Sequence, residues 1–481
     1  MSSRRSGKSV SRIKTGSFER RLSLTRAGLF AGTRMASHMA TNWLSSKETR
    51  EERHKAMLST QARFLVDELG KLKGSVVKIG QVMALYGEHF LPEEVTTALH
   101  TLEDQTTSLE WPAIERVLKA ELGDEKLAQL DIDPDPIGAA SLGQVHRAVR
   151  RSDGLELVLK IQYPGVADAV DSDLNAVAQI LKMARLVSFG PEFEDWLEEV
   201  REMMHREVDY RLEASTTEKF RKMLADDPRF IVPRVLPEYS SPQVIASTYE
   251  YGHPVSSETV GELSLERRSE LGKAALELFF RELFIWGEIQ TDPNFGNYRI
   301  RIAGEEGDDT DHDRIVLLDF GAVQAYSREF LDPVIQMIQA SYEDNLEAVI
   351  DGGVKLRFMS RDWPQDVLET FGRVCMSVLE PLSGDHDSWP DYAVNSKGQY
   401  RWKQSDLPSR VARQAARSAI SRYFRVPPSE FVFLNRKLIG VYTFIAVLYS
   451  EFNGEPLLRK YLYGEGDDRP DASATSQSTK A

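Results

Sequence analysis

The chain has 481 residues, room for about two or three domains, and its 41% hydrophobic and 28% charged residues are those of an ordinary globular protein. Its net charge of −14 argues against broad nucleic-acid binding, which needs a basic face to neutralise phosphates. The single cysteine, Cys375, excludes a disulfide within the chain and a cysteine-based metal site, and it favours a reducing compartment.

Residues 1–50 are predicted to be a basic, partly disordered arm. Positions 1–28 hold eight Lys or Arg and one Glu, a net charge of +7 against −21 for the rest. Apolar residues recur among the arginines of 18–35, which leaves two interpretations open. One is a solvated helix that packs on its own domain, and the other is a helix attracted to anionic lipid headgroups. A secretory signal is not expected, and a basic arm is favoured over an organellar transit peptide.

Residues 51–130 are predicted to be a helical extension. Apolar residues recur at helical spacing between positions 64 and 72, and Pro92 stands where a helix begins. Another helix is expected over 112–129, interrupted near Gly123. No stretch approaches the ~18 uninterrupted apolar residues of a membrane span, so the apolar run at 438–449 predicts a buried helix.

Residues 131–254 are predicted to form a small β-rich lobe with inserted helices. Asp-Pro-Asp-Pro at 133–136 predicts a turn, and a glycine- and alanine-rich loop follows at 137–143. Two strands, at 145–149 and 155–162, then form a hairpin. Helices are expected up to about 226, one of them over 196–220, and another strand is expected at 243–249.

Residues 255–463 are predicted to form a large helical lobe, helical throughout from 328 onward. Two short strands, 298–302 and 315–318, flank an acidic loop at 304–313 that holds six carboxylates. The tail at 464–481 is rich in Asp, Ser and Thr and is expected to be disordered. A β-rich region followed by a helical one indicates an α+β protein with two lobes.

The sequence Asp319-Phe320-Gly321 follows the second of these strands, and the glycine allows a sharp turn after it. A carboxylate at a strand end is a suitable ligand for Mg²⁺, which prefers oxygen. Alone this tripeptide is a weak signal. Two residues earlier in the chain, Asp292 and Asn297, strengthen it. Asp292 lies five residues before Asn297, which lies 22 residues before Asp319. Kinase-type phosphoryl transfer uses residues in this order. A first carboxylate orients or deprotonates the attacking oxygen, an amide oxygen then binds the metal, and a second carboxylate also binds the metal.

Lys160 lies among apolar residues of the predicted strand 155–162, a costly place for an ammonium group without a partner. We expect it to contact the α- and β-phosphates and to pair with a helix glutamate. The alternative is a strand lysine whose charged end reaches water. In the predicted helix 196–220, Glu207 and Asp209 lie on different faces, and Glu213 is the first choice of partner.

Small residues occupy the loop before the hairpin, and they allow a backbone to approach phosphates. The loop residues expected to contact the nucleotide are Ala139, Ala140, Ser141 and Gly143. No Gly-Lys-Ser/Thr follows, so this is not a Walker loop.

Six ordered motifs show that the chain resembles the UbiB/AarF (ABC1-type) family of atypical protein-kinase-like proteins over about residues 70–450. These motifs are Lys78-Ile79-Gly80-Gln81 (KxGQ), the alanine-rich loop from Ala139 to His146, the Lys160 strand to Gly165, Glu207-Val208-Asp209-Tyr210 (ExD), Gln290-Thr291-Asp292-Pro293-Asn294 and Asp319-Phe320-Gly321. The resemblance implies a divergent two-lobed protein-kinase-like fold with an N-terminal helical KxGQ extension.

The resemblance also implies roles for individual residues and the cofactors ATP and Mg²⁺. Lys160 is implied as the nucleotide-binding lysine, Glu213 as its partner, Asp292 as the catalytic-loop aspartate, and Asn297 and Asp319 as the Mg²⁺ ligands. The KxGQ helix is implied to lie over the active site near the ExD carboxylates and to obstruct a protein substrate. The residues in this occluding role are Lys78, which also counts as catalytic, with Gly80, Gln81, Glu207 and Asp209.

The resemblance further implies a role in ubiquinone biosynthesis or related isoprenoid-lipid metabolism at a membrane surface. The expected partners are an anionic lipid surface, a quinone precursor or other isoprenoid lipid, and other ubiquinone-biosynthesis proteins. The expected location is cytoplasmic and peripheral to a membrane, on the matrix side of mitochondria in a eukaryote. Two departures stand out: Gly138 replaces the first alanine of the family's loop, and the C-terminal membrane-spanning helices of some bacterial members are absent.

Four functions remain to be weighed. The first is an enzyme that hydrolyses ATP or phosphorylates a small or lipid-like substrate. The second is a nucleotide-gated, chaperone-like module that binds quinone precursors. A conventional protein kinase is disfavoured by the absence of His-Arg-Asp and by the KxGQ helix. An aminoglycoside-type phosphotransferase shares the Asp, Asn and Asp order but not the KxGQ motif.

Overall fold

The computed structural model describes residues 60, 75–86, 91–100, 108–183, 190–305, 310–419, 423 and 428–464. The predicted basic arm at 1–50, positions 64–72 of the helical extension and the tail from 465 lie outside these residues. The chain divides into two compact units, which are described one at a time. Unit 1 comprises residues 1–219 and 233–249, and unit 2 comprises residues 220–232 and 250–481.

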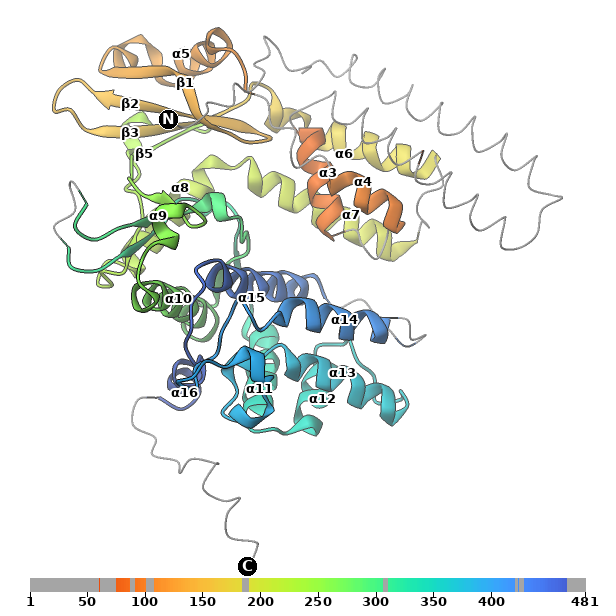
Figure 1. The fold of residues 1–481 in the computed structure, drawn as a ribbon. Coiled ribbons are helices and arrows are strands. Elements are labelled where there is room, and N and C mark those ends of the chain that lie inside the picture. Colours follow the sequence, from red (N-terminus) through yellow and green to blue (C-terminus); the bar gives the residue numbers. More distant parts are fainter. Residues whose placement is uncertain are drawn as a thin grey trace, which may run out of the picture. The chain divides into compact units, whose positions relative to one another are not determined.

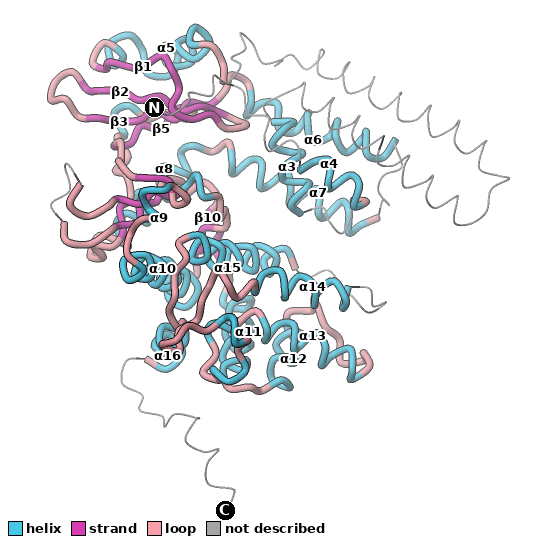
Figure 2. The backbone as a smooth tube through the Cα atoms, in the orientation of Figure 1, coloured by secondary structure: helices cyan, strands magenta, loops and turns pink. Residues whose placement is uncertain are grey.

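Unit 1 contains a four-stranded antiparallel sheet in the order β1-β2-β3-β5, whose strands are magenta in Figure 2. Its strands are β1 (Leu130–Ala139), β2 (Gly143–Arg150), β3 (Glu156–Gln162) and β5 (Val244–Thr248), and helix α5 (Trp111–Leu127) packs on the sheet. Successive side chains of a strand point to opposite faces. In β3, Leu159 and Ile161 are fully buried, so Lys160 between them lies on the opposite face.

The prediction of a turn at 133–136 is wrong, because these residues continue β1. The pairing of β1 with β2 is irregular there, with register shifts on either side of Pro136. Proline has no N–H for a sheet ladder and is tolerated on an edge strand. Since β1 is an edge strand of this sheet, the two prolines cost few ladder bonds.

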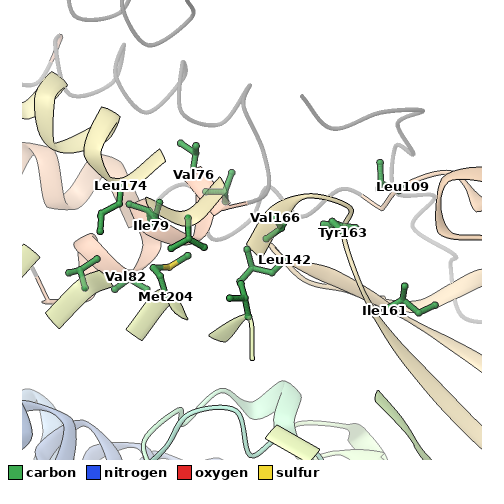
Figure 3. Close-up of a cluster of buried hydrophobic side chains, with 14 of the residues drawn as sticks. Val76, Ile79, Val82, Leu109, Leu142, Ile161, Tyr163, Val166, Leu174 and Met204 are labelled. Atoms are coloured by element: carbon green, nitrogen blue, oxygen red, sulfur yellow. The ribbon is translucent and has the colours of Figure 1, made fainter. Parts of the chain in front are cut away.

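Helices α3 (Ser75–Tyr86), α4 (Glu93–His100), α6 (Val166–Met183) and α7 (Pro191–Glu207) of unit 1 lie together in Figure 1. Helix α8 (Tyr210–Met223), whose first part belongs to unit 1, follows α7 along the chain. Figure 3 shows buried side chains where α3, α6 and α7 meet, among them Ile79, Leu174 and Met204, none of which is more than 1% exposed. Burial of this apolar face fixes the KxGQ helix, α3, against α6 and α7.

The single helix predicted over 196–220 is wrong, because α7 ends at Glu207 and α8 begins at Tyr210. The Asp209 carboxylate accepts a hydrogen bond from the Leu212 N–H at 3.0 Å, as an N-cap residue does. The ExD motif therefore occupies a break between two helices. Glu207 and Asp209 do not lie on one continuous helix, so the prediction that they lie on different faces of one helix does not apply.

Unit 2 contains two small sheets. One has the order β4-β9-β8-β6 and contains β4 (Phe230–Ile231), β9 (Arg314–Leu317), β8 (Tyr298–Arg301) and β6 (His253–Pro254). The other pairs β7 (Glu288–Gln290) with β10 (Val323–Ala325). The predicted strands at 298–302 and 315–318 correspond to β8 and β9, which pair antiparallel.

Helices make up most of the rest of unit 2. They are α9 (Glu258–Gly261), α10 (Leu265–Phe280), the π-helical turn η3 (Arg281–Trp286), α11 (Arg328–Tyr342), α12 (Leu346–Lys355), α13 (Gln365–Ser377), α14 (Leu407–Ala419), α15 (Ser429–Val447) and α16 (Glu455–Tyr463). The expectation of helix throughout 328–463 is too broad. Between α13 and α14 the chain makes short 3₁₀ turns, two of which contain or follow a proline, Pro381 and Pro390. No helix in the described part of the chain is long and apolar enough to cross a membrane.

Candidate active site

Two antiparallel pairings in unit 2 bring the predicted catalytic loop and the Asp319 segment together. Strand β7 ends just before Asp292, and strand β10 begins just after Gly321. The pairing of β7 with β10 therefore brings the start of the catalytic loop close to the end of the Asp319 segment. The β8–β9 pairing joins the other ends, and it is extended by a hydrogen bond from the Leu318 N–H to the Asn297 carbonyl at 2.9 Å. The sheets therefore hold Asp292, Asn297 and Asp319 in one region of unit 2.

The carboxylates of Asp292 and Asp319 each accept a hydrogen bond in this region. The Asn297 amide nitrogen donates to Asp292 Oδ2 at 2.9 Å, and the Gly321 N–H donates to Asp319 Oδ1 at 2.8 Å. Burial of the Tyr298 hydroxyl raises its pKa, and the carboxylates of Asp292 and Asp319 raise it further.

Gln290 connects the two segments through its side chain. Its amide oxygen accepts a hydrogen bond from the Asp292 N–H at 2.7 Å, and its amide nitrogen donates to the Asp319 carbonyl at 3.2 Å. Gln290 is 5% exposed, so water competes little for these bonds. Gln290 belongs to a predicted motif, but this bridging role was not predicted from the sequence.

Phe320 anchors the Asp319 segment on its other side. It is 3% exposed, and its ring centroid lies 4.9 Å from that of Phe220 near the end of α8. Aromatic pairs at this separation add to the burial of their area. The segment is thus held by a ladder, a side-chain bridge and an aromatic contact.

A buried ion pair lies beneath the catalytic loop. Lys437 Nζ of α15 lies 2.9 Å from Glu282 Oε2 of η3, and the two side chains are 4% and 2% exposed. Burial disfavours the charged ammonium, but the attraction of Glu282 outweighs burial and raises the pKa of Lys437. The one signal for this pair in the sequence is a lysine directly before the apolar run 438–449, and the pair was not predicted.

Replacing Lys437 with Met is expected to lower the free energy of unfolding by about 3–5 kcal/mol, because it leaves a buried carboxylate without its ammonium. Urea unfolding followed by circular dichroism measures this loss. Lys273→Met is the matched control, because its pair with Glu270 is 40% and 65% exposed and is expected to contribute at most about 1 kcal/mol. Equal losses in the two variants would contradict the buried pair's importance.

In unit 1, Lys160 forms the predicted ion pair. Its Nζ donates to Glu213 Oε1 at 2.6 Å, and the side chains are 27% and 9% exposed. The ammonium also lies 5.3 Å from the ring centroid of Tyr210, within the range of a cation–π contact. The structure thus contains the pair, and its contact with phosphates stays a prediction. The prediction that Lys160 acts on the same nucleotide as Asp319 joins residues of different units and also stays a prediction.

The alanine-rich loop lies between β1 and β2. Ala139 and Ala140 are exposed, Ser141 is half-buried, and the Ala140 N–H donates to the Gly143 carbonyl at 2.8 Å. A Cβ atom at Gly143 would lie 2.5 Å from the backbone carbonyl oxygen of Ile161, so the close approach of the two strands requires glycine. A Cβ atom at Gly138 would meet no atom within 4 Å, so the alanine of the family pattern would fit there.

The KxGQ and ExD motifs meet in unit 1. Lys78 Nζ lies 2.5 Å from Glu207 Oε1, with the side chains 24% and 34% exposed. Gly80 is buried and Gln81 is half-buried on the same helix. Asp209 is exposed and caps α8. The structure joins Lys78 to the ExD motif, and the occluding role of these residues stays a prediction.

Comparison with known proteins identifies the family. The model of the ABC1 atypical kinase-like domain matches residues 101–352, more than half of the chain. The chain belongs to the ABC1 atypical kinase-like family. The resemblance drawn from the six motifs is therefore confirmed.

Individual ABC1-family relatives match over most of the chain. "Probable serine/threonine-protein kinase abkA" of Dictyostelium discoideum is 28% identical over 407 residues, covering 82% of this chain and 69% of that protein. "Atypical kinase coq-8, mitochondrial" of Caenorhabditis elegans is 28% identical over 406 residues, covering 83% of this chain. The chain spans only 51% of the length of this second relative.

A solved structure shows the fold. The complex of Rv3197 with erythromycin from Mycobacterium tuberculosis matches with a TM-score of 0.55 at 24% sequence identity, covering 86% of this chain and 99% of that one. At this identity the likeness concerns the fold alone. Together with the family match, it confirms the predicted α+β, kinase-like fold.

Proposed function

We propose that this ABC1-family protein is an ATP- and Mg²⁺-dependent atypical kinase or ATPase that supports ubiquinone or related isoprenoid-lipid biosynthesis at a membrane surface. The observation that carries the proposal is the arrangement of Asp292, Asn297 and Asp319 in unit 2, in the order that phosphoryl transfer uses. The kinase names of the relatives support the reaction class, and the name coq-8 supports the biosynthetic role.

The donor atoms of unit 2 fit Mg²⁺. Mg²⁺ is usually held by one or two carboxylates together with phosphate oxygens and water. Asp319 supplies a carboxylate, and Asn297, whose amide nitrogen donates to Asp292, supplies an amide oxygen. Bound Mg²⁺ would neutralise charge on the β- and γ-phosphate oxygens.

The chain's own residues then have separate tasks. We propose that Asp292 orients the attacking oxygen, of water or of a substrate hydroxyl, and accepts its proton. We propose that Lys160 contacts the α- and β-phosphates while its ammonium donates to Glu213. We propose that the loop 139–143 also supplies backbone N–H groups to the remaining phosphate oxygens, apart from that of Ala140, which donates to the Gly143 carbonyl.

The Lys78–Glu207 ion pair supports turnover without a protein substrate. It ties the KxGQ helix to the ExD break, where we propose that the helix obstructs a protein substrate. Water or a small, lipid-like hydroxyl compound is then the favoured acceptor. We propose a peripheral membrane location, on the mitochondrial matrix side in a eukaryote, since the relative coq-8 is named mitochondrial.

Phosphate release by the full chain tests the proposed function. We expect release from ATP that requires Mg²⁺, labels no added protein, and rises with anionic vesicles or quinone-like phenols. Release without Mg²⁺, or transfer to general protein substrates at a higher rate, would contradict it. Nucleotide-dependent binding of a quinone precursor with no phosphate release would favour the chaperone-like module instead.

Deleting residues 1–28 is expected to weaken binding to anionic vesicles at least about tenfold, because each basic residue near such a surface contributes about 1 kcal/mol. Flotation with vesicles that contain phosphatidylserine measures this. Deletion of residues 465–481 is the control, and neutral vesicles should show no difference between the chains. Unchanged flotation after the first deletion would remove the lipid role of the arm.

A further inference from the structure

Helix α15 packs directly against the catalytic loop. A Cβ atom at Gly440 would overlap the Pro293 ring, so the helix approaches the residue after Asp292 as closely as a glycine allows. One turn earlier, Lys437 forms its buried pair with Glu282 on the turn that precedes β7. The position of α15 relative to the loop is therefore fixed at two points.

This packing brings Arg436 to the catalytic aspartate. An Arg436 guanidinium nitrogen lies 3.5 Å from Asp292 Oδ1, while the Asn297 amide donates to Oδ2. One carboxylate oxygen thus contacts a neighbour in the loop, and the other contacts α15. Two contacts on opposite oxygens restrict rotation of the carboxylate about its terminal bond.

The exposure of the pair argues against a mainly structural role. The Arg436 and Asp292 side chains are 28% and 34% exposed, and ion pairs this open contribute little to stability. Stability at this contact comes instead from the buried Lys437–Glu282 pair and from the packing of Gly440. Arg436 also lies outside residues 101–352, so the family match says nothing of it.

We propose that Arg436 is a positioning residue that holds the Asp292 carboxylate in the orientation that accepts the acceptor's proton. This inference rests on the proposed function. It gives α15 a part in the reaction, and it makes turnover, rather than nucleotide binding, sensitive to Arg436. A misplacement of a reacting group by about 1 Å can reduce a rate by about 100-fold.

The test compares kcat and nucleotide affinity in full-length variants. Arg436→Gln is expected to lower kcat about 10- to 100-fold, with the Kd for Mg-ATP changed less than about twofold. Arg436→Lys keeps the charge and is expected to recover most of the loss. Arg413→Gln is the matched control, because Arg413 also lies 3.5 Å from an aspartate, Asp406, at the surface of α14.

A double-mutant cycle separates positioning from an independent effect. If Arg436 acts through Asp292, then Arg436→Gln lowers the residual rate of the Asp292→Asn variant by less than about twofold. Two results would overturn the inference and leave the proposed function standing. One is that Arg436→Gln lowers kcat by the same factor in the wild-type protein and in the Asp292→Asn variant. The other is that Arg436→Gln leaves kcat unchanged. Wild-type protein without Mg²⁺-dependent turnover would overturn both.

Discussion

Replacing Asp319 with Asn is expected to lower Mg²⁺-dependent phosphate release at least about 100-fold, because the amide removes the charge that holds the metal. The side chain keeps its size, and its remaining oxygen still accepts the Gly321 N–H, so the fold should survive. The expected signature is a protein of normal stability whose nucleotide affinity with Mg²⁺ equals its affinity without Mg²⁺. Phosphate release and calorimetry with and without Mg²⁺ measure these quantities.

Asp332→Asn is the control for this variant, since Asp332 is an exposed carboxylate on α11 of the same unit. It should match the wild type in stability, affinity and turnover. An Asp319→Asn protein that still releases phosphate at the wild-type rate would contradict the assignment of the metal ligand.

Replacing Lys160 with Met is expected to lower turnover about 100-fold or more, because the methyl thioether packs along β3 but cannot contact phosphate oxygens. The variant also removes the ammonium from Glu213, whose side chain is 9% exposed, so a loss of stability of roughly 1–3 kcal/mol is expected as well. These two effects need to be separated.

The double variant Lys160→Met with Glu213→Gln separates them. Neutralising the buried carboxylate should restore most of the stability, because no charge is then left without its partner. Turnover should stay low, since the ammonium is still missing. Recovery of turnover together with stability would mean that Lys160 has a structural role only.

The sequence predicted those parts of the site that depend on local chemistry. Short sequence segments predicted the hairpin of β2 and β3, the order of Asp292, Asn297 and Asp319, and the pairing of Lys160 with Glu213. The residue types in these segments are compatible with few other structures or functions. The apolar neighbours of Lys160 predicted that its ammonium needs a partner, and the structure supplies that partner in Glu213.

The parts that the sequence did not predict depend on neighbours in space. Prolines favour a turn, but the edge position of β1 lets Pro136 remain in a strand. Helical periodicity continues through the ExD motif, but Asp209 caps a new helix there. Arg436 and Lys437 carry no motif, and their roles follow only from the packing of α15 on a loop far away in the sequence.

The central proposal is that Lys160 and Asp319 act on one ATP molecule. Calorimetric titration of the full chain with a non-hydrolysable ATP analogue tests this most directly. We expect one nucleotide per chain, bound tightly only with Mg²⁺, and loss of that binding in both Lys160→Met and Asp319→Asn. Wild-type affinity and stoichiometry in either variant would contradict it.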